Sequence, residues 1–244
     1  MGMENVRATY EGLLKLQPDV RPFVLTRAAY AGAQRYAATW TGDNTASWNH
    51  MRLSVPQLIN LGLSGYAFVG DDIGGFAGSP EPNLLTRWIE AGVFNPIYRD
   101  HTAKGTADQE PWVHGAKHEA IRKRYIEERY RLLPYIYTSV EEMTRTGIPL
   151  MRPLLLEYPQ SPEFFDDDRE YLFGPDLFVS AVTTELQDTK VVQLPPGTWY
   201  NYWTGQKTTD RELIKVRPAL DEVPVYARAG AIVPRQPVVQ STGE

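Results

Sequence analysis

The apolar and polar positions divide the chain into two parts of different periodicity. In the first part, short apolar runs alternate with stretches whose apolar residues recur at helical spacing, which predicts βα units and a parallel sheet. The predicted strands cover residues 21–27, 36–41, 65–70 and 94–98. The predicted helices cover residues 4–16, 47–61, 82–92 and 115–145. We expect a kink at Pro134 rather than a stop, because the apolar pattern continues beyond this proline.

After Gly147 the pattern changes to short β-branched and aromatic runs bounded by proline and glycine, which predicts a small antiparallel β-sandwich. The predicted strands cover residues 150–156, 171–183, 189–194, 198–203, 212–216 and 224–234. The predicted fold class is therefore α/β plus all-β, with one domain over residues 1–146 and another over 147–244. Four strands cannot close an eight-stranded barrel, so the first domain is expected to be an open sheet or half of something larger.

Composition narrows the classes of protein. The 244 residues are 42% hydrophobic and 23% charged, as in folded globular proteins, and they contain no apolar run of membrane-spanning length. A net charge of −5 argues against a nucleic-acid partner. The absence of cysteine excludes a disulfide scaffold and thiolate chemistry. No Asn-x-Ser/Thr sequon and no apolar signal-peptide core occur, so we expect a cytoplasmic protein without membrane attachment.

The carboxyl ends of the four predicted strands gather polar residues. In parallel α/β architectures these ends carry the catalytic side chains. All four end in charged or imidazole groups, and three of them contain a carboxylate: Leu25–Arg27, Trp40–Asn44, Gly70–Phe76 and Tyr98–His101. We therefore expect a site along this edge of the sheet.

Asp43 is the first candidate. Trp40 supplies an apolar wall, which suits a general acid because such a wall disfavours the carboxylate anion, and Gly42 allows close approach to a ligand. An equally weighted alternative is that Asp43 caps the helix beginning near Ala46 or Ser47.

The other strand ends add four candidates. Adjacent residues point in different directions, so at most one of Asp71 and Asp72 is expected to enter the site, where Phe76 offers a stacking face. The phosphate-binding glycine motifs are absent, which excludes nucleotide binding. Arg27 is expected to pair with a carboxylate. His101 either bonds a substrate or has a structural role, and the residues leave both open.

No metal or cofactor is predicted. His114 and His118 stand four residues apart, but the intervening glutamate of a zinc protease is missing. Asp166–Asp168 lacks the alternating oxygen ligands and the glycine of a calcium loop.

Several ordered segments resemble one family. The segment Trp40-Thr41-Gly42-Asp43-Asn44 is similar to the acid/base motif of glycoside hydrolase family 31, the family of α-glucosidases and α-xylosidases. Further similar segments, in family order, are 7–13, 21–27, 70–76, 99–101, 130–135 and 195–200. The resemblance implies a (β/α)8 TIM barrel followed by β-sandwich domains. Residues 1–146 would be its second half, with the fourth helix and the fifth to eighth βα units.

The resemblance also implies roles for the candidates. Asp43 corresponds to the general acid/base, Arg27, Asp72 and His101 surround the sugar, and Trp40 and Phe76 form walls of its pocket. The family retains anomeric configuration, which requires a nucleophilic carboxylate beside the acid. Its Trp-x-Asp-Met-Asn-type nucleophile motif does not occur here, and Gly2-Met3 resembles the sequence just after it. We therefore expect part of an α-glucosidase that acts on α-glucosides or oligosaccharides but is inactive alone.

Two alternatives remain. Asp72 or Asp100 could partner Asp43, and a wider separation of the two carboxyl groups would then predict inversion. In the other, the chain is a non-catalytic half-barrel that associates with a partner or its own copy through exposed sheet edges. The sugar and the linkage are not determined by these residues.

Overall fold

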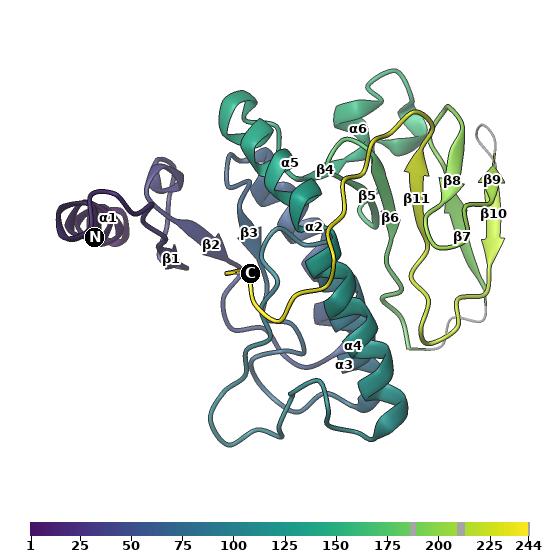
Figure 1. Ribbon diagram of the computed structural model, residues 1–244, viewed down its shortest axis with the longest axis horizontal. Helices are drawn as coiled ribbons and strands as arrows, with labels where there is room; N and C mark the ends of the chain where they lie inside the picture. Colours follow the sequence, from purple (N-terminus) through teal and green to yellow (C-terminus); the bar gives the residue numbers. More distant parts are fainter. Residues whose placement is uncertain (186–188, 209–212, 244) are drawn as a thin grey trace.

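A computed structural model describes residues 1–185, 189–208 and 213–243. The first part of the chain alternates short strands with helices, and helices α2 to α5 lie between the parallel strands and the second part (Figure 1). Its elements are α1 (Gly2–Leu16), β1 (Leu25–Thr26), β2 (Ala38–Trp40), α2 (Trp48–Leu63), β3 (Val69–Gly70), α3 (Pro82–Gly92), α4 (Ala116–Arg131) and α5 (Leu133–Thr146). None of the helices in the described ranges combines the length and the apolar character that a membrane span requires.

Strands β1, β2 and β3 form a parallel sheet in that order. The prediction of a strand over residues 94–98 is wrong, since β3 is the last strand that the first part forms among its described residues. Phe94 and Asn95 instead close the end of α3 through bonds to its last carbonyls, and Pro96 has no N–H to donate to a sheet. The chain then runs beside β3, where the Ile97 N–H donates to the Val69 carbonyl at 3.0 Å. The partial TIM-barrel region is confirmed, but its fourth strand position holds this extended segment.

The long helix expected over residues 115–145 is two helices. Helix α4 ends at Arg131 and α5 begins at Leu133, with Leu132 between them. The kink expected at Pro134 is therefore wrong. A proline lacks the N–H of a continuous helix but fits the first turn of a new one, where Pro134 lies.

The second part is an antiparallel β domain, as expected. Six strands form one sheet in the order β4-β5-β6-β11-β8-β9, and β10 pairs with β7 in a second sheet. The elements are β4 (Met151–Pro153), α6 (Leu154–Glu157), β5 (Glu170–Phe173), β6 (Leu177–Ser180), β7 (Lys190–Gln193), β8 (Trp199–Asn201), β9 (Lys207–Thr208), β10 (Leu213–Val216) and β11 (Val225–Arg228).

Three of the strand predictions in this domain need correction. The strand expected over 150–156 ends at Pro153 and continues as helix α6. The run over 171–183 is a hairpin, β5 and β6, because Gly174 has a φ of 62° that turns the chain back. The strand expected over 224–234 ends at Arg228. Residue 212 of the predicted strand 212–216 lies outside the described residues.

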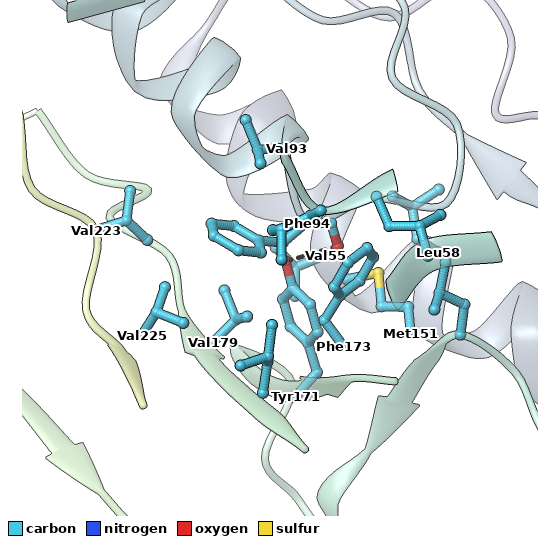
Figure 2. Packing of buried hydrophobic residues seen from close by; sticks show 14 of the residues in the cluster. Val55, Leu58, Val93, Phe94, Met151, Tyr171, Phe173, Val179, Val223 and Val225 are labelled. Atoms are coloured by element: carbon cyan, nitrogen blue, oxygen red, sulfur yellow. Dashed lines mark hydrogen bonds between the residues drawn. The ribbon is translucent and has the colours of Figure 1, made fainter. Parts of the chain in front are cut away.

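Strands β4, β5 and β6 of the six-stranded sheet are buried on both faces. Along β5, Tyr171 and Phe173 contact the helices of the first part, whereas Leu172 between them faces the sheet of β7 and β10. Side chains alternate across a strand, so an uninterrupted apolar run indicates burial on both sides. Figure 2 shows how Tyr171 and Phe173 pack among Val55 and Leu58 of α2 and Phe94, which follows α3. One apolar core therefore crosses the sequence boundary expected near residues 146–150.

This shared core predicts a single cooperative unfolding transition. Phe173 is fully buried, and its ring lies 5.8 Å from that of Phe94. Phe173→Ala is expected to lower the free energy of unfolding by about 3–5 kcal/mol, because it leaves a cavity between the two parts. Urea unfolding followed by hydrogen exchange checks this, with the half-exposed Phe165→Ala as the control. Loss of protection in the β domain alone would contradict a shared core.

Candidate active site

The parallel sheet brings its functional side chains to one edge. Because β1, β2 and β3 run in the same direction, the segments that follow them begin at the same end of the sheet. The segment carrying Arg99 and His101 joins this edge, since the Ile73 N–H donates to the Arg99 carbonyl at 3.1 Å and Asp100 bridges Ile73. Four segments far apart in sequence therefore meet.

Asp43 forms an ion pair with Arg27. The Arg27 Nη1 donates to Asp43 Oδ1 at 2.5 Å, and both side chains are about half exposed. The pairing expected for Arg27 is confirmed. The capping alternative for Asp43 is wrong, because Ser47 caps helix α2 and its hydroxyl accepts from the His50 N–H. Asp43 is thus held at the sheet edge by a cation.

Trp40 lies beside two cations. The guanidinium carbon of Arg99 is 4.9 Å from the centre of the indole ring, and that of Arg27 is 6.0 Å away. Both distances allow an attraction between cation and ring quadrupole. The indole Nε1 is buried and has no hydrogen-bond partner among the residues that the structure describes. Trp40 therefore connects the two arginines.

The two adjacent aspartates after β3 have different environments. Asp71 accepts from Trp88 Nε1 at 2.7 Å and from Asn95 Nδ2 at 3.0 Å, which ties the strand end to α3. Asp72 accepts instead from Arg99 Nη2. Only Asp72 joins the candidate site, as expected for neighbouring residues. Burial raises the pKa of Asp71 to about 6.

Phe76 and His101 form a stacked aromatic pair at the same edge of the sheet. Their ring centres lie 5.3 Å apart with an interplanar angle of 28°, so the rings stack. The Phe76 carbonyl also accepts from the Ala103 N–H at 2.9 Å, which joins the two loops that carry the rings. His101 itself is exposed to solvent.

Asn44 and Gly75 hold these loops together, and neither was among the candidate site residues named from the sequence. The Asn44 amide donates to the Asp72 carbonyl at 2.9 Å and accepts from the Phe76 N–H at 2.8 Å. Gly75 has a φ of 93°, and a β-carbon on it would lie 2.3 Å from the Ala46 nitrogen. Only glycine fits there. Arg99 was also missed as a separate site residue, although it stands in the segment that resembles the family.

His114 and His118 contact neighbouring side chains of the fold. Arg122 Nη2 lies 2.9 Å from His114 Nδ1, and Thr86 Oγ1 lies 2.9 Å from His118 Nδ1. Burial lowers the pKa of both histidines, and the positive charge of Arg122 lowers it further. A buried cation bonded to one of these rings disfavours a second, metallic cation. Within the described ranges, no group of three or more histidine and carboxylate side chains could hold a metal ion.

The arrangement suits a neutral, hydroxylated ligand. Two arginine–aspartate pairs supply donors and acceptors for hydroxyl groups, and the rings of Trp40 and Phe76 provide apolar faces. The half-exposed carboxyl of Asp43 is available for proton transfer.

Known proteins are similar to this chain over nearly all of its length. The Glycosyl hydrolases family 31 TIM-barrel domain matches residues 1–139, and the Glycosyl hydrolase family 31 C-terminal domain matches residues 147–233. The chain is 43% identical to α-glucosidase 2 of Bacillus thermoamyloliquefaciens over 96% of its own length and 30% of that protein. It is 42% identical to human neutral α-glucosidase C, covering 99% of this chain and 27% of the relative. The chain thus spans less than a third of these relatives.

A solved structure agrees closely. The dextranase of Flavobacterium johnsoniae complexed with glucose has a TM-score of 0.94 and 36% identity, covering 98% of this chain and 31% of that one. The resemblance inferred from the motifs is therefore confirmed. The chain belongs to glycosyl hydrolase family 31.

Proposed function

We propose that this chain supplies the general acid/base, Asp43, and part of the sugar pocket of a retaining α-glucosidase that removes terminal α-linked glucose from oligosaccharides. The observation that carries the proposal is the half-exposed Asp43 carboxyl, bonded to Arg27 at the sheet edge and not used to cap a helix. The names of the α-glucosidase relatives support the substrate class.

In this proposal Asp43 protonates the departing oxygen and later removes a proton from water. Arg27, Asp72 and His101 bond the hydroxyl groups of the sugar, and Trp40 and Phe76 pack against its apolar faces.

A retaining reaction needs a second carboxylate about 5–5.5 Å from the first. We assign Asp72 to hydroxyl binding rather than to nucleophilic attack, because it is buried and bonded to Arg99. For the same reason we disfavour an inverting pair of Asp43 and Asp72. The isolated chain would then hold the acid without a nucleophile and would be inactive alone.

We also propose residues 1–146 and 147–244 as the two domains. The end of α5 at Thr146, followed by Gly147 with a φ of 77°, supports this boundary. A cytoplasmic location is likewise a proposal, supported by the absence of cysteine and of glycosylation sequons.

A second candidate function is assembly of the half-barrel with a partner or with its own copy. Strand β1 pairs only with β2 among the described strands, so its other edge is unpaired. A cavity of about 1160 Å³ opens beside the amino ends of the strands, lined by Phe23, Phe68 and Ile136 among others. Phe23 is 63% exposed. Exposed apolar surface of this kind favours association.

The proposed lack of a nucleophile predicts that the isolated chain does not hydrolyse p-nitrophenyl α-glucoside. The released nitrophenolate should not exceed that of a heat-denatured sample. Robust turnover that Asp43→Asn abolishes would contradict this, because the chain would then contain both carboxylates.

The acid/base role of Asp43 predicts the behaviour of a chimera in which this chain replaces its counterpart in the Bacillus thermoamyloliquefaciens relative. Asp43→Asn should lower kcat/KM on an oligosaccharide by about 10²–10⁴-fold, since protonation of the leaving oxygen is lost. With a 2,4-dinitrophenyl glucoside, Asp43→Asn should lower the rate of glycosidic bond cleavage by a smaller factor, because this leaving group needs little protonation. Exposed Asp19→Asn is the matched control. Equal losses on both substrates would rule out the acid role.

Assembly predicts a concentration-dependent dimer or larger species of the isolated chain by sedimentation velocity. Phe23→Ser should shift the equilibrium toward monomer, because it removes apolar area from the open face. Phe165→Ser, at 49% exposure on the β domain, should not. A monomer at high concentration would exclude self-association.

A further inference from the structure

Arg99 is fixed relative to the sheet by its backbone. Its carbonyl accepts from the Ile73 N–H at 3.1 Å, and Asp100 forms a bridge with Ile73. Arg129 secures the preceding turn, because its guanidinium donates to the carbonyls of Val93 and Asn95 at 2.6 and 2.7 Å. The side chain of Arg99 therefore starts from a defined position at the sheet edge.

The Arg99 guanidinium contacts two groups of the site at once. Its Nη2 donates to Asp72 Oδ1, and its central carbon lies 4.9 Å from the centre of the Trp40 ring. The Asp72 side chain has no exposed surface, and that of Arg99 is 28% exposed. We propose that Arg99 is a positioning residue that holds the Asp72 carboxylate and the Trp40 indole in one arrangement around the sugar. This inference rests on the proposed function.

The second carboxylate oxygen of Asp72 is the atom that this arrangement leaves available to a ligand. Asp72 Oδ2 is buried and has no hydrogen-bond partner in the described part of the chain, as is also true of Trp40 Nε1. A buried polar atom without a partner is costly unless a ligand satisfies it. With Oδ1 held by Arg99, Oδ2 is the acceptor left for a sugar hydroxyl.

The charge of Arg99 also keeps Asp72 able to accept. Burial raises the pKa of Asp72, and the hydrogen bond and charge of Arg99 oppose that rise. His101 also lowers this pKa, whereas the negative charge of Asp43 raises it. A protonated Asp72 would lose acceptor capacity, so removal of Arg99 weakens the site even where the fold persists.

The two arginine–aspartate pairs differ in exposure, and this separates their roles. Arg27 and Asp43 are 55% and 45% exposed, so their bond can exchange with water or substrate. In the pair of Arg99 and Asp72 the carboxylate is buried. Breaking this bond would leave a buried charge unpaired. The first pair contains the group that transfers the proton, and the second is a fixed frame.

The first experiment measures the titration of Asp72 directly. Carboxyl ¹³C NMR of the 244-residue chain, with the Asp72 signal identified by its loss in Asp72→Asn, should give a pKa higher by about one unit or more in Arg99→Leu. Arg99→Lys should restore part of the shift. Arg145→Leu, which removes an exposed arginine paired with Glu141, is the control and should change nothing. An unchanged Asp72 titration in Arg99→Leu would overturn the inference.

The second experiment uses the chimera with the Bacillus relative. Arg99→Leu should lower kcat/KM about 10²-fold, and the acid limb of its pH profile should move to higher pH because Asp72 must be ionised. Arg99→Lys should recover part of the loss, because it restores the positive charge. A purely structural defect would not be relieved by that charge. If Asp43→Asn inactivates the chimera but Arg99→Leu leaves the rate and the acid limb unchanged, the role of Arg99 is wrong and the proposed function stands. If Asp43→Asn has no effect, the proposed function fails, and the NMR titration still decides the role of Arg99 at Asp72.

Discussion

The parallel pairing of three very short strands is the constraint on which the candidate site depends. Strands β1, β2 and β3 contain only two or three residues each, yet their pairing sets where Arg27, Asp43 and Asp72 emerge. So short a sheet contributes few hydrogen bonds of its own. Its geometry must therefore be maintained by the elements packed around it.

The shared apolar core provides that support. Val69 of β3 belongs to the same buried cluster as α2, α4, α5 and the inner face of the six-stranded sheet. Arg87 of α3 adds polar links, since it donates to the carbonyls of Ala219 and Glu222 in the β domain. The β domain therefore packs against and supports the helices that position the strand ends.

The site itself combines one adaptable ion pair with one fixed pair around a common indole. The half-exposed bond between Arg27 and Asp43 leaves the carboxyl accessible for proton transfer. The second oxygen of the buried Asp72 has no hydrogen-bond partner among the residues that the structure describes. Trp40 lies beside both pairs, with the guanidinium carbons of Arg27 and Arg99 at 6.0 and 4.9 Å from its ring centre. In the function that we propose, Trp40 is therefore the side chain shared by the pair that binds the sugar and the pair that transfers the proton.

The sequence by itself determined the alternation of strands and helices and the change of periodicity near Gly147, because both follow from local spacing. The resemblance of its motifs also indicated the family and the segments that carry the candidate site. It did not determine that residues 94–98 follow β3 without forming a strand, that Leu132 separates two helices, or that the two parts share one core. Nor did it pair Arg99 with Asp72, 27 positions apart, in preference to another cation. Those features depend on which surfaces meet after folding. Local patterns report the periodicity of a segment, whereas only the tertiary structure decides its partner.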